Sequence, residues 1–182
     1  MSSPVPVVFA GGSSGLWRVE RIVAVAGAGL PSAERLAVHE GATDAPSDST
    51  SWLLRGVTGH HRYVESKERP GLAGPPPLGR AEARSAALIP IRKSAAWWEL
   101  AQDERRAILE EQSHHIAVGL QYVPAIARRL YHSRELGEPF DFLTWFEFAP
   151  SDGGAFDALL AKLRATQEWK YVEREVEVRL TR

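Results

Sequence analysis

The chain of 182 residues contains no cysteine, and its single methionine is Met1. Without thiols the protein has no disulfide framework, no thiol catalysis and no cysteine-ligated metal site. Apart from Met1, it also lacks the sulfur side chains that oxidants attack most readily. A charge surplus is missing too, because 22 Lys and Arg oppose 23 Asp and Glu, for a formal net charge of −1. This balance argues against a nucleic acid or an anionic membrane as partner, since both attract basic surfaces.

Long hydrophobic runs are also absent from the sequence. No segment approaches the roughly 20 apolar residues that span a bilayer, and the opening MSSPVPVVFAGG lacks the basic and apolar regions of a signal peptide. We therefore expect a cytoplasmic protein. Tryptophan, by contrast, is abundant, and the six residues are Trp17, Trp52, Trp97, Trp98, Trp145 and Trp169. The default expectation for Trp97, Trp145 and Trp169 is the core or a subunit contact.

A segment rich in proline and glycine at residues 69–85 divides the chain. The part that follows, residues 86–182, shows the clearer pattern of alternating and helical hydrophobicity. It predicts strands at Ala86–Ile91, Ile126–His132, Phe142–Phe148 and Val172–Leu180, a helix at Ala101–Gly119 and a second helix capped by Ser151. The resulting order, β-α-β-β-α-β, is that of a ferredoxin-like unit.

Residues 1–68 are predicted to form a shortened ferredoxin-like half. Strands are expected near Val5–Ala10, at Leu16–Val25 and from Trp52 into the GHHRYVE stretch, with a brief helix at Ser32–His39. Placed side by side, the two halves would form one α+β subunit of the barrel type, with the helices outside. This expectation rests on the order of the elements.

Two residues of the second half are unusual for their positions. On the predicted helix, His115 shares the stripe of Ile108 and Val118, whereas His114 points about 120° away from Ile108. A histidine there is either a hydrogen-bonded core residue or the single axial ligand of a haem. On its strand, Arg128 alternates with apolar residues, so its guanidinium either reaches the surface or meets a carboxylate, a phosphate or an anionic ligand.

The run SAAWWELAQDERRAILEEQSHHIAVGLQYVPAIARRLYHSRELGEPFDFLTWFEF resembles the chlorite dismutases, and the short chain resembles their small, dimeric subgroup. The motif that carries the resemblance is a histidine followed thirteen residues later by an arginine in SHHIAVGLQYVPAIAR, with WW, IPIRKS and DFLTWFE around it. The likeness extends from about Ala86 to the C-terminus and is weaker around SWLLRGVTGHHRYVE. It selects His115 and Arg128, the same residues that stand out by their positions on the apolar faces of the predicted helix and strand.

The resemblance implies one haem b per subunit, bound in the second half with His115 as proximal iron ligand. It further implies that Glu168 accepts a hydrogen bond from the His115 imidazole, and that Arg128 acts on the distal side as the catalytic residue. Tyr63 and Trp98 are weaker candidates for contacts with the haem edge or propionates. A homodimer is expected on the same basis.

The implied activity is the conversion of chlorite to chloride and dioxygen through a ferryl species and hypochlorite, which Arg128 would retain until they recombine. One alternative is a coprohaem decarboxylase, a relative that does not typically carry the distal arginine. A non-catalytic haem carrier or sensor is the other alternative, since it would also need His115 but not a buried arginine.

Overall fold

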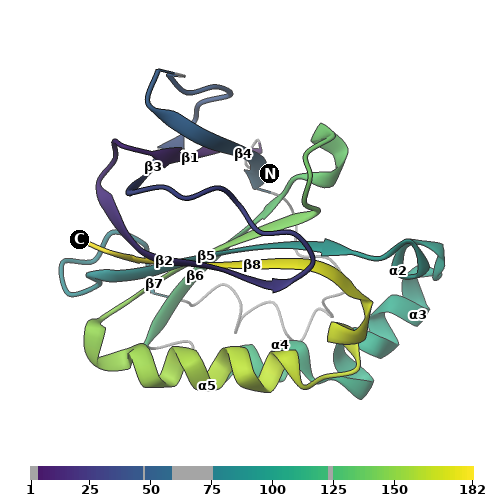
Figure 1. Ribbon diagram of the computed structural model, residues 1–182. Helices are drawn as coiled ribbons and strands as arrows, with labels where there is room; N and C mark the ends of the chain where they lie inside the picture. The colour runs from purple at the N-terminus through teal and green to yellow at the C-terminus, as the bar shows by residue number, and fades with distance from the viewer. Residues whose placement is uncertain (1–3, 47, 59–75, 123–124) are drawn as a thin grey trace.

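The computed structural model describes residues 4–46, 48–58, 76–122 and 125–182, in which eight strands form a closed barrel (Figure 1). The strands are β1 (Pro6–Gly12), β2 (Trp17–Ala26), β3 (Arg35–Glu40), β4 (Thr50–Thr58), β5 (Ser85–Lys93), β6 (Ile126–His132), β7 (Phe142–Phe148) and β8 (Val172–Thr181). Around the barrel their order is β1-β3-β2-β8-β5-β7-β6-β4, and the paired strands are antiparallel.

The helices of the described residues belong to the second half of the chain. They are the α-helices α2 (Ala95–Glu99), α3 (Gln102–Arg106), α4 (His115–Leu120) and α5 (Gly153–Arg164), the π-helix η1 (Ala107–Gln112), and the 3-10 helices η2 (Arg134–Leu136), η3 (Pro150–Asp152) and η4 (Glu168–Tyr171). Figure 1 shows α4 and α5 side by side on the outer face of the sheet. None of the helices in these residues is long and apolar enough to cross a membrane.

The prediction of mixed α and β structure around an antiparallel sheet is confirmed. From β5 to β8 the order β-α-β-β-α-β is the predicted one, which is consistent with a ferredoxin-like unit. The predicted helix at Ser32–His39 is wrong, because the chain there enters strand β3, which pairs with β1 along its whole length. Leu36 and Val38 both pack on the barrel core, so the hydrophobic period in this segment is two.

The single helix predicted at Ala101–Gly119 is also wrong. The helical conformation is interrupted between η1 and α4, where His114 takes the left-handed conformation with φ of 53°. After the break, the Glu110 carboxylate accepts hydrogen bonds from the backbone N–H groups of Ile116 and Ala117, at 2.7 and 3.3 Å, and so stabilises the start of α4. His115 and Ile108 therefore lie on different helices, and a continuous helical stripe does not position His115.

The second helix of this half begins later than predicted. A 3-10 turn, η3, precedes α5, and Asp152 rather than Ser151 occupies the N-cap, without a side-chain capping bond. The predicted apolar stripe of α5 is confirmed, since all four of its members are buried: Phe156, Leu159, Leu160 and Leu163. They pack on the outer face of β5, β6 and β7, whereas a separate cluster of aromatic and aliphatic side chains fills the barrel.

Candidate functional site

His115 is the first residue of α4, and its side chain is 25% exposed between the sheet and the helices. Its Nδ1 lies 2.6 Å from Oε2 of Glu168, the first residue of η4. A carboxylate at Nδ1 fixes the orientation of the imidazole and leaves Nε2 as the nitrogen available to a metal. The structure thus brings together His115 and Glu168, which are separated by 53 residues in the sequence.

The Glu168 carboxylate is buried and takes part in a network of its own. Its Oε1 accepts a hydrogen bond from Nζ of Lys93 at 2.7 Å, and its backbone N–H donates to Oγ of Ser113 at 2.9 Å. Burial alone would raise the pKa of Glu168, but the charges and hydrogen bonds of His115 and Lys93 outweigh burial and lower the pKa to about 2. The carboxylate is therefore ionised at neutral pH and can accept a hydrogen bond from the Nδ1–H of His115.

Lys93 belongs to this network, although it was not predicted as a site residue from the sequence. It ends β5 and is buried, with Nζ 4.4 Å from the ring centroid of Trp97. Its backbone N–H donates to Oδ2 of Asp141 at 2.7 Å. Strand alternation places Lys93 on the face of Ile89 and Ile91, so the argument that singled out Arg128 would have found Lys93 as well.

Trp169 lies beside the His115 ring. The two rings are stacked, with centroids 6.4 Å apart and an interplanar angle of 18°. The indole Nε1 of Trp169 donates to Oε2 of Glu175 at 2.7 Å, and the other oxygen of Glu175 accepts from Arg164. Since Glu175 is fully buried, this second carboxylate keeps the indole in place against the imidazole.

Arg128 lies on β6 opposite Phe146 of β7. It shares the helix-covered face with Ile126, whereas the following Arg129 pairs with Glu40 on the other face, as the alternation predicts. A Cβ atom added to Gly119 of α4 would lie 3.1 Å from Nη1 of Arg128. Gly119 follows His115 by four residues, so the Arg128 guanidinium contacts the face of α4 that carries His115.

The Arg128 side chain has no counter-charge in the described parts of the chain. No hydrogen bond or ion pair to its guanidinium is formed there, and burial lowers the pKa of this group. A guanidinium in such surroundings attracts an anion, because it cannot shed its charge within the ordinary pH range.

The remaining predicted site residues have separate environments. Trp98 donates from Nε1 to Oδ2 of Asp141 at 3.2 Å, so it connects to Lys93 through that carboxylate. The guanidinium carbon of Arg134 lies 4.0 Å from the Trp98 ring centroid. Tyr63 lies outside the residues that the structure describes.

The donor set suits a haem. A haem iron takes its four equatorial nitrogens from the porphyrin and needs one axial imidazole from the protein, which Nε2 of His115 could provide. Partly buried apolar side chains pack against the cluster between the sheet and α5: Val118, Tyr122, Ala125, Trp169 and Val172. The residues present therefore fit the cofactor.

Together, the closed antiparallel barrel, its outer helices and the histidine held by a buried carboxylate define an α+β barrel protein with a candidate site around His115. Residues 49–182 match the family model described as chlorite dismutase. The chain belongs to the chlorite dismutase family, and the resemblance found in the sequence is confirmed.

Known relatives share different amounts of the chain. The chlorite dismutase of Ideonella dechloratans is 36% identical over 129 residues, which cover 69% of this chain and 42% of that protein. The chain thus matches less than half the length of this curated relative. A dimeric chlorite dismutase from Nitrobacter winogradskyi is 58% identical, with a TM-score of 0.89 over 97% of this chain and 99% of the other. A mutant chlorite dismutase from Candidatus Nitrospira defluvii shares the fold at 19% identity, with a TM-score of 0.69 over 98% and 91% of the chains.

Proposed function

We propose that the protein is a haem b enzyme that converts chlorite to chloride and dioxygen, and that it works as a homodimer with one haem in each subunit. Family membership and the similarity to a dimeric chlorite dismutase support this function. The observation that carries it is the Arg128 guanidinium, which has no counter-charge among the described residues and contacts the helix face of His115.

His115 would hold the haem iron through Nε2, while the Glu168 carboxylate accepts a hydrogen bond from the Nδ1–H of His115. The negative charge of Glu168 makes the imidazole a stronger electron donor, and Lys93 holds that carboxylate in place and ionised. When bound, the haem supplies the redox-active iron at which bonds between chlorine and oxygen are broken. Trp169 restricts the rotation of the imidazole by stacking on it.

On the distal side, Arg128 acts by its charge. Chlorite is an anion, and its conversion to chloride and dioxygen balances without any proton or external reductant. A permanently charged guanidinium therefore suits the reaction better than an acid or base, because it attracts anionic chlorite and would retain an anionic hypochlorite in the site. The low polarity around Arg128 strengthens this attraction.

The domain organisation and the remaining contacts are part of the proposal. Residues 1–68 and 86–182 form two ferredoxin-like halves joined by residues 69–85, supported by the strand orders β4-β1-β3-β2 and β6-β7-β5-β8. In each half the fourth strand adjoins the first, and the third lies between the first and the second. Trp98 contacts the haem edge or propionates, supported by the guanidinium groups of Arg105 and Arg134 near its ring.

An oxygen electrode tests the function. Rapid dioxygen release after chlorite is added to the haem-loaded protein is expected, and its absence would refute the proposal in favour of a haem carrier or a decarboxylase. Arg128→Ala should bind haem normally by Soret titration, while its oxygen yield falls and hypochlorite appears in solution. Arg129→Ala is the matched control, because Arg129 is the neighbouring residue on the opposite face of β6. If the oxygen yield and the active lifetime of Arg128→Ala equal those of Arg129→Ala, Arg128 has no role in the mechanism.

A further inference from the structure

A cavity of about 540 Å³ lies at the end of the barrel where β2 begins and β8 finishes. It is lined by four arginines and by apolar side chains, and its members include Arg18, Arg35, Arg84, Arg182, Leu16 and Pro150. The volume is in the range of small-molecule sites. Four guanidinium groups in one cavity are a strong local concentration of positive charge in a chain whose formal net charge is −1.

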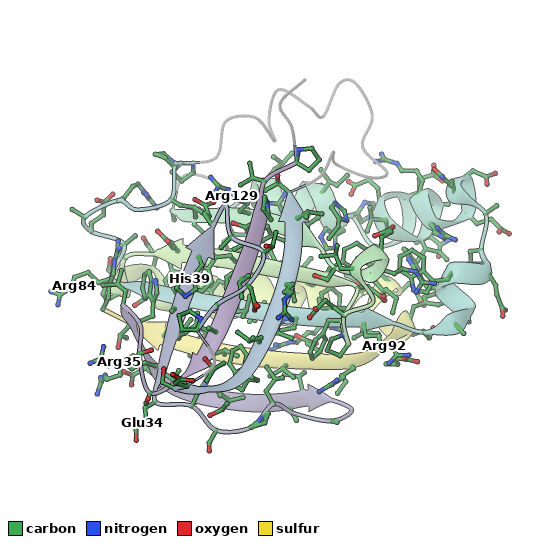
Figure 2. All side chains as sticks on the ribbon, turned by 90° about the horizontal axis from the view of Figure 1, so that it is seen from above. Glu34, Arg35, His39, Arg84, Arg92 and Arg129 are labelled. Atoms are coloured by element: carbon green, nitrogen blue, oxygen red, sulfur yellow. The ribbon has the colours of Figure 1, made fainter. Side chains whose placement is uncertain are left out.

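This cavity is separate from the His115 site. Arg84 directly precedes β5 and Lys93 is the last residue of that strand, so the two residues lie about 30 Å apart along the sheet. Figure 2 shows Arg35 and Arg84 at one end of the molecule, pointing outward, and Arg92 at the other end. The arginine cavity therefore requires an explanation other than haem binding.

The arginines of the cavity are held mainly by main-chain oxygens. Arg35 donates to the Gly15 carbonyl at 3.3 Å, and Arg84 donates to the main-chain oxygen of Arg182 at 3.0 Å. Arg182 itself donates to two carbonyl groups and lies with its guanidinium carbon 4.7 Å from the Trp17 ring centroid. These contacts orient the guanidinium groups without using all of their donors.

Carboxylate side chains compensate only part of this charge. Glu20 pairs with Arg18 at 2.5 Å and also accepts a hydrogen bond from Thr181. Within the described residues no acidic side chain forms an ion pair with Arg35, Arg84 or Arg182. Glu34 lies next to Arg35 in the chain, yet the two side chains are not paired (Figure 2).

We propose that this cavity binds the phosphate group of a small phosphate ester. A guanidinium fork matches phosphate oxygens in geometry and charge, and a bound dianion would relieve the repulsion among the arginines. Arg35 and Arg84 hold the phosphate, while the organic part lies against Leu16 and Pro150. Leu16 is 62% exposed, which leaves its side chain available for this contact.

Isothermal titration calorimetry at low ionic strength tests the site with adenosine monophosphate, inorganic phosphate and pyrophosphate as probes. The wild-type protein is expected to show saturable binding, and the double variant Arg35→Gln/Arg84→Gln at least tenfold weaker binding. Arg92→Gln is the matched control, because Arg92 is an exposed arginine at the opposite end of the sheet, paired with Glu173. It should bind the probes like the wild type.

The outcomes separate the possible occupants. Tighter binding of adenosine monophosphate than of inorganic phosphate or pyrophosphate supports a phosphate ester as the ligand. Equal binding of the three probes shows that the phosphate group alone is recognised and overturns the proposal of an ester. No saturable binding, or equal binding by the double variant, overturns the site. If light scattering shows that the double variant changes from dimer to monomer, this face is a contact between copies of the chain, and the proposal of a ligand site is overturned.

Discussion

The buried pair of Lys93 and Glu168 gives a prediction about stability that can be tested without haem. Their side chains are 4% and 5% exposed, and Nζ lies 2.7 Å from Oε1. Lys93→Met keeps most of the apolar stem but removes the charge, so the Glu168 carboxylate keeps its contact with Nδ1 of His115 and its other side-chain partner is lost. Removing one partner of a buried ion pair costs about 3–5 kcal/mol, because the other charge is left uncompensated.

Because the hydrogen bond between His115 and Glu168 remains, we expect a loss near the lower limit, about 3 kcal/mol. For a protein of this size, such a loss lowers the Tm by about 6–12 °C. Glu168→Gln should also destabilise, since it leaves the Lys93 ammonium buried without a carboxylate. The double variant Lys93→Met/Glu168→Gln has no uncompensated charge, so its loss should fall short of the sum of the single losses by about 1–3 kcal/mol.

Urea denaturation of the haem-free protein at pH 7, followed by tryptophan fluorescence, measures these free energies of unfolding. Lys162→Met is the matched control, because Lys162 is an exposed lysine of α5 with a hydrogen bond of 3.4 Å to Gln121. Its change in stability should stay within about 0.5 kcal/mol. Strictly additive single losses, or a Lys93→Met variant as stable as the control, would refute the assignment of Lys93 and Glu168 as one coupled unit.

Two further predictions concern Gly119 and Glu177. Gly119→Ala places a Cβ 3.1 Å from Nη1 of Arg128, so the guanidinium has to shift by a few tenths of an ångström. In urea denaturation of the haem-free protein, the gain of about 1 kcal/mol that alanine usually brings to a helix should therefore be reduced, and the full gain would contradict the contact. Burial tends to raise the pKa of Glu177, but hydrogen bonds from three arginines lower it from 4.5 to about 2. Because this folded-state pKa lies below the unfolded value, its stabilisation is complete above about pH 5 and is lost as the pH falls towards 2. Glu177→Gln should therefore cost up to about 3 kcal/mol at pH 7, and the difference from wild type in urea denaturation should shrink at lower pH; a constant difference would contradict this origin.

The strands of the second half could be predicted because their hydrophobic residues alternate and turn residues bound them. Strand β7 was predicted with its observed bounds, Phe142–Phe148. Strand β3 was predicted as a helix because its pairing with β1 overrides local preference, and that pairing joins residues about thirty positions apart. The break before α4 depends on the left-handed His114 and on the Glu110 carboxylate, neither of which follows a hydrophobic period.

The candidate site was predictable to a similar degree. His115 and Arg128 were selected by face arguments, although the helical stripe behind His115 is interrupted in the structure. Glu168 followed only from the family resemblance, since nothing local distinguishes it from other acidic residues near a helix end. The stacking of Trp169 on His115 could not be predicted, because it results from how η4 and α4 pack.

The contrast between Arg128 and the other charged groups on its side of the sheet bears most directly on function. Lys93 pairs with Glu168, and Glu175 and Glu177 pair with Arg164 of α5, so the buried carboxylates on this face are compensated. Arg128 is half-buried on the same face and has no such partner in the described residues. An uncompensated charge lowers the stability of a fold. Under the proposed function, the position of Arg128 beside the face of α4 that carries His115 is explained by an anion that binds to its guanidinium. The same reasoning predicts that an anion bound next to a loaded haem raises the stability of the wild-type protein but not that of Arg128→Ala.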